Sequence, residues 1–225
     1  MEPVEKPPNP SRLNSPFVLT INAPRGSGKT FLLLNLLIHD NFYNDMFDKI
    51  YLITPSAYQD PKYSILDLPS SQIMITFDEK RITKIIKDKH PDDEYLFIFD
   101  DIITQDEFKK NAGNDSIINT IAINGRHMNV SMIISSQKTS GVSSFVRSQA
   151  DGVYIFKQRS MNEIDAIHND NSVDGLNRKD FSKLVSKATK EQYSFLMINY
   201  QNGKVFASFK EIENIQAYIN EIQDE

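Results

Sequence analysis

The sequence predicts an α/β fold in which a mostly parallel sheet carries helices on both faces and ends in a C-terminal antiparallel hairpin. Three observations lead to this prediction. Short, continuous apolar runs alternate with stretches of helical apolar spacing, which is typical of a sheet buried on both faces. A glycine-rich loop at 23–30 joins the first apolar run to a leucine-rich one. Near the C-terminus, Asn202-Gly203 separates two further apolar runs and favours a tight hairpin turn.

The individual elements follow from local patterns. "FVLTIN" is a short, mostly apolar run, and "YLFIFDD" is a five-residue apolar run that ends in two acids, so both predict buried strands. Ile82, Ile85 and Ile86 recur at helical spacing among charged residues, which predicts an amphipathic helix. In the next helix Asp115 is the expected N-cap and Gly125 the expected stop. The expected strands are 17–22, 49–54, 72–76, 95–101, 129–137, 151–157, 193–200 and 204–210, and the expected helices are 30–40, 78–89 and 115–127.

Composition narrows the class of protein. At 225 residues, with 40% hydrophobic and 24% charged residues, the chain matches one globular domain. The absence of cysteine excludes disulfides, thiolate metal sites and a cysteine nucleophile. The proline-rich start lacks the apolar stretch of a secretory signal, and the apolar runs are too short for a membrane span. We expect a flexible arm over 1–15, a domain over 16–210 and a helical tail over 211–225.

The loop "APRGSGKT" has the residue types that hold a phosphate chain. Gly26 and Gly28 let the backbone curl around an anion, and the start of the following helix favours negative charge. Lys29 is placed to reach the β- and γ-phosphates of a nucleotide, and the Thr30 hydroxyl to ligate Mg²⁺. The alternative is a glycine-rich turn with an exposed lysine. The predicted nucleotide contacts are Ala23, Pro24, Arg25, Gly26, Ser27, Gly28, Lys29 and Thr30.

Three polar residues end buried strands at the edge where open α/β sheets bind ligands. Asp100 suits a Mg²⁺ contact through water. Asp101 would face the γ-phosphate and orient or deprotonate a water. Gln137 ends "VSMIISSQ", where it can hydrogen-bond both the attacking water and the γ-phosphate. The alternatives are that the acids only cap a strand end and that Gln137 bonds to backbone.

Three arginines that follow the acid pair in the sequence are candidates for a contact with the γ-phosphate: Arg126, Arg147 and Arg159. An arginine inserted from a neighbouring subunit often meets the charge that develops on a γ-phosphate. Each of the three, taken alone, is equally consistent with an ordinary surface arginine.

In this order and spacing, "APRGSGKT", "YLFIFDD" and "NGRHMNVSMIISSQ" resemble the genome-packaging ATPases of poxviruses, giant viruses and virophages, small members of the FtsK/HerA superfamily of DNA translocases. The three motifs are specific as a set, whereas any one alone is not. The resemblance implies a RecA-like P-loop ATPase domain in which the Gln137 strand lies between the phosphate-loop strand and the Asp100 strand. It also implies ATP, Mg²⁺, a homo-oligomeric ring and double-stranded DNA in the channel.

The resemblance also assigns roles to single residues. Lys29 and Thr30 become the nucleotide contacts, Asp100 takes the metal role, and Gln137 becomes the sensor. Arg126 matches the position of a finger that acts across the subunit boundary, and Arg147 is the second choice. Most relatives have Asp-Glu where this chain has Asp100-Asp101. Aspartate is one methylene shorter and reaches less far, so there are two alternatives to direct general-base action by Asp101: it acts through a second water, or Glu107 assists.

The expected partners follow from charge and from the resemblance. The net charge of −5 gives no general sign of nucleic-acid binding, so DNA contact must be local. Lys109 and Lys110 stand in a stretch that can line a channel and touch phosphates. The alternative is 178–190, whose lysines recur as on a solvated helix face. The resemblance further implies a hexamer or pentamer, capsid proteins as partners, and a place in cytoplasmic viral factories, with the virion as a second location.

Other classes of nucleotide-binding protein fit less well. A kinase should show an arginine-rich lid or a His-Arg-Asp motif, and a GTPase should show Asn-Lys-x-Asp; the sequence has none of these. A second ATPase alternative is a replicative helicase or helicase loader, and only the family resemblance distinguishes it from a packaging ATPase. A further alternative is a nucleotide-stabilised scaffold without motor activity. An assay of phosphate release distinguishes such a scaffold from an ATPase.

Overall fold

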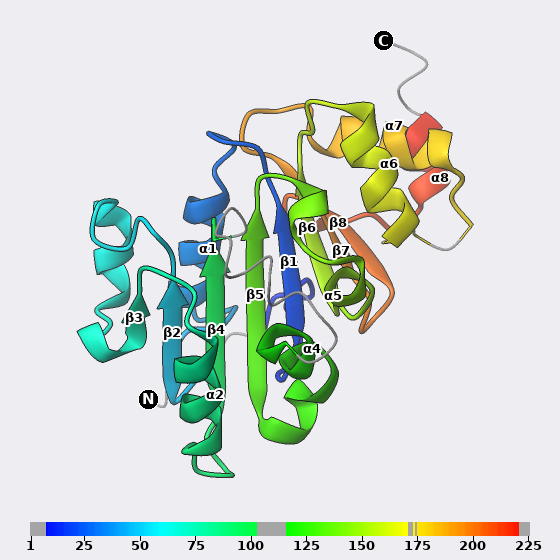
Figure 1. Ribbon diagram of the computed structural model, residues 1–225. Helices are drawn as coiled ribbons and strands as arrows, with labels where there is room; N and C mark the ends of the chain where they lie inside the picture. Colours follow the sequence, from blue (N-terminus) through cyan, green and yellow to red (C-terminus); the bar gives the residue numbers. More distant parts are fainter. Residues whose placement is uncertain (1–7, 103–115, 171–172, 174, 221–225) are drawn as a thin grey trace, which may run out of the picture.

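The computed structural model describes residues 8–102, 116–170, 173 and 175–220. Its strands are β1 (Val18–Asn22), β2 (Lys49–Ile53), β3 (Ile73–Met74), β4 (Tyr95–Asp100), β5 (Val130–Ser136), β6 (Gly152–Phe156), β7 (Phe195–Asn199), β8 (Lys204–Ala207) and β9 (Lys210–Glu211). They form one nine-stranded sheet in the order β3-β2-β4-β5-β1-β6-β7-β8-β9 (Figure 1).

The sheet confirms the predicted fold class. Strands from β3 across to β6 pair in parallel, and β7, β8 and β9 add antiparallel pairs. The hairpin around Asn202-Gly203 is therefore confirmed. β5 lies between β1 and β4, as the RecA-like arrangement requires. The expected strand 72–76 is shorter than predicted, because its first residue belongs to a 3₁₀ turn and only Ile73 and Met74 pair with β2.

Helices connect most of these strands. They are α1 (Lys29–Ile38), α2 (Glu79–Lys87), α4 (Ile117–Met128), α5 (Ser144–Ser148), α6 (Met161–Asp170), α7 (Arg178–Ala188) and α8 (Ile215–Asn220), with 3₁₀ turns η1 (Pro61–Leu66), η2 (Ser70–Gln72) and η3 (Thr139–Gly141). Side-chain caps define the starts of α2, α4, α5 and α7: Asp78, Ser116, Ser143 and Asn177 each accept a hydrogen bond from the backbone N–H three residues on. A cap of this kind is worth about 1 kcal/mol.

The ends of α4 differ from the prediction. Its N-cap is Ser116, one residue beyond the expected Asp115, which lies outside the described residues. Gly125 does not stop the helix: α4 continues to Met128, and Asn129 ends it in a left-handed conformation with φ 52°. Gly125 is needed for packing instead, because a Cβ at this position would lie 2.6 Å from the Val130 carbonyl oxygen. The helix thus lies close against the chain that enters β5.

Apolar side chains cover both faces of the sheet. Figure 1 shows α2, α4 and α5 in front of the sheet and α1 behind it. The leucines of α1, including Leu33 and Leu36, pack on one face against strand residues such as Ile98 and Ile133. On the other face, side chains of α2, α4 and α5 pack on β4 and β5, while α6, α7 and α8 cover β6 to β8. Full burial of one such side chain contributes about 1.5–3 kcal/mol.

Residues near both termini also contribute to the core. Leu13 is fully buried with the α1 cluster, and Ile219 of α8 is buried against α7. The packed part of the molecule therefore extends past 16 on one side and past 210 on the other. The division into arm, domain and tail, and the flexibility expected of the arm, stay predictions. Among the described residues, no helix has the length and apolar character that a membrane span requires.

The parallel strands place their carboxyl ends at one edge of the sheet, which is the upper edge in Figure 1. The glycine-rich loop follows β1 at this edge, and Asp100 and Gln137 stand where β4 and β5 end. Arg126 and Asp151 lie at the opposite edge, where β5 and β6 begin. A seven-residue strand such as β5 separates the two edges by roughly 20 Å at about 3.3 Å per residue.

Candidate nucleotide-binding site

The loop between β1 and α1 has the backbone shape that an anion cradle needs. Gly26 (φ 81°) and Gly28 (φ 95°) are both in the left-handed region, which a side chain disfavours. The Ser27 N–H and hydroxyl both donate to the Pro24 carbonyl, at 3.2 and 2.7 Å, and so close the turn. Ala23 is fully buried and its N–H donates to the Ser136 carbonyl at 2.9 Å. Ala23 therefore continues the hydrogen bonding of β1 with β5 at the entrance to the loop, and its predicted nucleotide contact stays a prediction.

The start of α1 is free to receive negative charge. Gly28 caps the helix without a side-chain hydrogen bond, and its first turn holds no acidic residue. The first backbone N–H groups of a helix lack intrahelical partners and carry the positive end of the dipole. Together with the positive-φ glycines, this start fits a nucleotide phosphate chain. Thr30 follows in the first turn and is half-buried.

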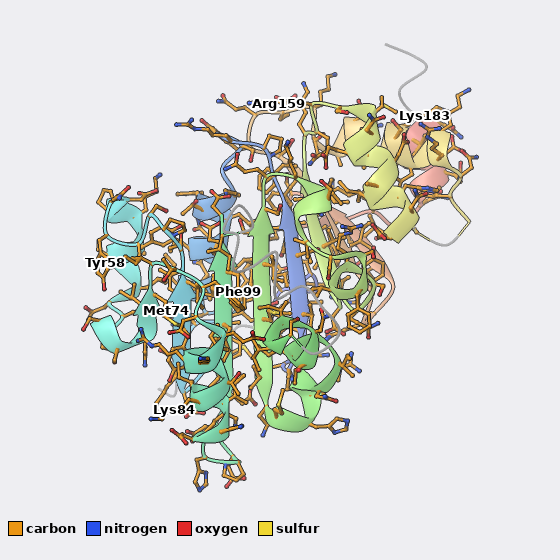
Figure 2. All side chains as sticks on the ribbon, viewed as in Figure 1. Tyr58, Met74, Lys84, Phe99, Arg159 and Lys183 are labelled. Atoms are coloured by element: carbon orange, nitrogen blue, oxygen red, sulfur yellow. The ribbon has the colours of Figure 1, made fainter. Side chains whose placement is uncertain are left out.

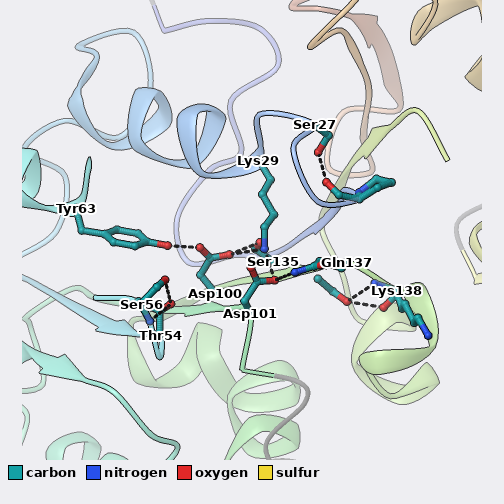
Figure 3. A network of polar contacts seen from close by, with 12 residues as sticks. Ser27, Lys29, Thr54, Ser56, Tyr63, Asp100, Asp101, Ser135, Gln137 and Lys138 are labelled. Carbon is teal, nitrogen blue, oxygen red and sulfur yellow. Dashed lines mark hydrogen bonds and ion pairs between the residues drawn. The ribbon is translucent and has the colours of Figure 1, made fainter. Parts of the chain in front are cut away.

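Two acids from the end of β4 meet the loop lysine (Figure 3). Lys29 is buried, and its Nζ lies 3.3 Å from Asp100 Oδ1 while it also forms an ion pair with Asp101. The side chain of Asp101 is 33% exposed, and its backbone is left-handed with φ 56°. This conformation turns Asp101 away from the strand direction. One carboxylate is therefore buried beneath the loop and the other faces the open side.

Gln137 completes the predicted group. Its Nε2 donates to Asp101 Oδ1 at 3.2 Å, so the end of β5 is joined to the end of β4 (Figure 3). Lys29, Asp100, Asp101 and Gln137 thus lie within one hydrogen-bonded cluster, although Lys29 and Gln137 are 108 residues apart in the sequence. Their chemical roles stay predictions, since geometry alone assigns none.

Two partners of Asp100 were missed from the sequence. Ser135 Oγ donates to Asp100 Oδ1 at 2.5 Å, and the two residues are direct neighbours in the β4–β5 register. The Tyr63 hydroxyl, from η1, donates to Asp100 Oδ2. Burial, together with the neighbouring carboxylate, raises the pKa of Tyr63, so its hydroxyl stays protonated and donates at neutral pH. The paired "SSQ" at the end of β5 gave a signal for Ser135, whereas nothing in the irregular segment around Tyr63 pointed to it.

Asp100 and Asp101 provide only part of a Mg²⁺ site. Among the described residues, no group of three or more histidine, aspartate or glutamate side chains could hold a metal by itself. Asp100 is buried and fixed by three donors, which suits a carboxylate that contacts metal-bound water. A Mg²⁺ ion here would therefore need phosphate oxygens as further ligands, which is its usual manner of binding with nucleotides.

The three candidate arginines lie in different surroundings. The Arg126 side chain is 68% exposed and pairs at 2.5 Å with Asp151, at the far edge of the sheet. Arg147 is nearly buried: it pairs with Asp170 at 2.7 Å and donates to the carbonyls of Thr139 and Val142. Its donors are thus used within its own subunit.

Arg159, the candidate to which the resemblance assigned no role, contacts the phosphate loop. Its guanidinium donates to the Arg25 carbonyl at 3.5 Å, and Figure 2 shows it at the upper edge of the molecule. Lys109, Lys110 and Glu107 lie outside the described residues, so their predicted roles stay predictions.

A cavity of about 1250 Å³ opens beside the phosphate loop. Lys29, Asp101 and Gln137 line it, together with the exposed side of α1. Aromatic side chains line it as well: Phe31, Phe42, Phe156, Tyr193, Phe195 and Phe209. The cavity is large enough for a ligand of nucleotide size.

The fold and this cluster define a P-loop nucleotide-binding protein. A family model described as Poxvirus A32 protein matches residues 8–210, and the chain belongs to that family. This family match confirms the resemblance to poxvirus-type proteins. A comparison with curated proteins gives no significant match.

Solved structures agree with the fold. The chain is similar to the genome packaging NTPase B204 from Sulfolobus turreted icosahedral virus 2 in complex with ATP-gammaS, with TM-score 0.60, 19% identity, and 86% and 97% of the two chains covered. B204 of Sulfolobus turreted icosahedral virus, described as a DNA-packaging ATPase, gives TM-score 0.60, 17% identity, and 88% and 97% coverage. The cytoplasmic domain of the Thermomonospora curvata type VII secretion ATPase EccC gives TM-score 0.52 and 10% identity, with 93% of this chain but 28% of that chain covered.

Proposed function

We propose that the chain is an ATP-hydrolysing motor that moves viral double-stranded DNA into a capsid. The observation that carries the proposal is the cluster of Lys29, Asp101 and Gln137 at the start of α1, in a chain of the Poxvirus A32 protein family. The structural neighbours named as packaging enzymes, one of them with an ATP analogue bound, support it. The activity is that of a Mg²⁺-dependent ATPase.

The phosphate chain of ATP binds at the loop and at the start of α1. Lys29 then exchanges its ion pairs with the two carboxylates for the phosphate oxygens, and this exchange releases Asp101. Thr30 and Asp100 would hold Mg²⁺, which would neutralise part of the phosphate charge. Asp100 is held in place throughout by Ser135 and Tyr63.

Hydrolysis uses the released carboxylate. Asp101 orients a water and accepts its proton, while the water oxygen bonds to the γ-phosphorus and the bond to the β–γ bridging oxygen breaks. Gln137 donates to Asp101 and reports the loss of the γ-phosphate. The signal has a path along the chain, since Lys138 leads into η3 and Arg147 of α5 holds the η3 carbonyl of Thr139.

The motor acts as a homo-oligomeric ring, a hexamer or a pentamer, around the DNA. Arg126 supports this arrangement, because it lies a strand length from its own phosphate loop and can reach ATP only in a neighbouring subunit. Lys109 and Lys110 remain the proposed DNA contacts. Capsid proteins are the proposed docking partners, in cytoplasmic viral factories and in the virion.

Phosphate release, measured with and without double-stranded DNA, tests the proposal. We expect Mg²⁺-dependent release that DNA stimulates, and none from Lys29→Ala, in which the phosphate contact is missing. A protein that binds ATP but releases no phosphate under either condition would be a scaffold. Strand separation on forked DNA, without translocation along intact duplex, would identify a helicase.

A further inference from the structure

We propose that the aromatic part of the cavity is a nucleobase subsite, and that the ring of Tyr193 is the surface against which the base packs. This inference rests on the proposed function, since it concerns the same nucleotide. The subsite would bind the nucleobase, which is the part of the nucleotide that the phosphate loop does not recognise.

The cavity joins two chemically different walls. Lys29, Asp101 and Gln137 line it at the ends of β4 and β5. Phe195 and Phe209, from the β7–β8 side of the sheet, line it elsewhere, with ring centroids 4.8 Å apart in an edge arrangement. A nucleotide likewise combines a charged phosphate chain with a flat apolar base. Phosphates bound at the loop therefore leave the aromatic wall for the base.

Tyr193 stands where the two walls meet. A Cβ built on Gly28 of the phosphate loop would lie 3.1 Å from Tyr193 Cδ1, so the ring lies directly against this loop. The residue is nevertheless 60% exposed, and its backbone is left-handed with φ 67°. A left-handed backbone is costly for a large aromatic residue, and residues strained in this way cluster at ligand-binding sites. Such an arrangement is expected where the ring binds a ligand.

The turn before β7 fixes this position. The Ser194 N–H and hydroxyl both donate to the Glu191 carbonyl, at 3.2 and 2.7 Å. On α1, which lines the same cavity, the Asn35 amide donates to the Phe31 carbonyl at 2.7 Å, and its oxygen bonds to His39. Both ends of the amide are thus used within the helix. The exposed aromatic face of Tyr193, which lies against the phosphate loop, is available to the base, and stacking on it contributes without reading the base edges.

The test compares two ligands that share the phosphate chain and differ in the base. Binding of ATP and of inorganic tripolyphosphate, each with Mg²⁺, is measured by titration calorimetry for wild type, Tyr193→Ala and Tyr193→Phe. We expect Tyr193→Ala to weaken ATP binding roughly 5- to 100-fold, the range for loss of one stacked base. Tripolyphosphate binding should stay within about twofold, and Tyr193→Phe should bind ATP like wild type. Tyr58→Ala is the matched control, because Tyr58 is 68% exposed and does not line the cavity (Figure 2).

Three results would overturn the subsite. Unchanged ATP affinity in Tyr193→Ala would mean that the base lies elsewhere. Equal loss of both ligands would mean that Tyr193 only supports the phosphate loop through Gly28. Loss in Tyr193→Phe as large as in the alanine variant would exclude stacking as the cause. Failure of the proposed function is a separate outcome: it would show as wild-type protein that binds ATP without releasing phosphate.

Discussion

At the scale of single residues, the site depends on one lysine shared by two carboxylates. Lys29 contacts both Asp100 and Asp101, yet the two acids differ in burial and in their other partners. Asp100 is 1% exposed and held by Ser135 and Tyr63, whereas Asp101 is partly exposed and contacts Gln137. A fixed, buried carboxylate suits a metal contact, and an accessible one suits water. The structure therefore supports different roles for the two neighbours.

Changing Asp101 to asparagine tests this division. The variant should bind Mg-ATP with near-normal affinity, because Asp100 and the loop are untouched, but hydrolyse it on the order of 10²–10⁴-fold more slowly. Nucleotide affinity and single-turnover phosphate release are the two measurements. Asp92→Asn is the control, since the Asp92 side chain is 93% exposed and does not line the cavity. If affinity collapses while the remaining turnover is normal, Asp101 is the metal contact and the two roles are exchanged.

Removing the Tyr63 hydroxyl tests the support of Asp100. Tyr63→Phe keeps the ring but removes a hydrogen bond to a buried carboxylate, which is worth about 1.5–3 kcal/mol. We expect a loss of unfolding free energy of about that size in denaturant titration without nucleotide. Tyr58→Phe, at an exposed position of the same segment, should change stability by less than about 0.5 kcal/mol. Equal stability of the two variants would show that the Tyr63 contact contributes nothing.

At the scale of elements, the sequence predicted those parts whose pattern is local. Continuous apolar runs become strands buried on both faces, and their carboxyl ends necessarily share an edge, so Asp100, Asp101 and Gln137 could be brought together without coordinates. Tyr63 and Tyr193 could not, because irregular segments bring them to the site and no periodicity marks such segments. α5 and α6 were also missed, since α5 has only five residues and α6 a weak apolar pattern.

The misassigned Gly125 shows why a local pattern is not sufficient. Glycine usually predicts the end of a helix, but here it allows α4 to pack against the Val130 carbonyl. Gly125→Ala should therefore destabilise the protein by about 1–3 kcal/mol, because backbone must shift to accept the Cβ. Thermal or denaturant unfolding measures the change. Ile123→Ala, on the exposed side of α4, should cost far less. A stabilised Gly125→Ala variant would mean that helix propensity outweighs the close contact.

At the scale of the whole molecule, the two edges of the sheet have different chemistry. The upper edge carries the phosphate loop and the acid pair, while the lower edge carries Arg126 on Asp151. Asp151 also accepts the Val18 N–H at 2.8 Å, so it stays bonded when Arg126 leaves. An exposed arginine with a replaceable partner can turn to a ligand of a neighbouring subunit. A ring that sets one subunit's lower edge against the next one's upper edge would complete each site.

Arg126→Ala should bind ATP and yet be nearly inactive, because an arginine finger acts on charge that develops during transfer and is worth roughly 10³–10⁵ in rate. The decisive experiment mixes Arg126→Ala with Lys29→Ala subunits, each inactive alone. A Lys29→Ala subunit can still supply its intact Arg126 to an intact phosphate loop next door, so mixed rings should recover part of the hydrolysis. Thermal melts of each variant check that it folds. If mixtures stay inactive while wild-type rings exchange subunits freely, Arg126 acts within its own subunit through Asp151, and Arg159 beside the phosphate loop becomes the arginine to test.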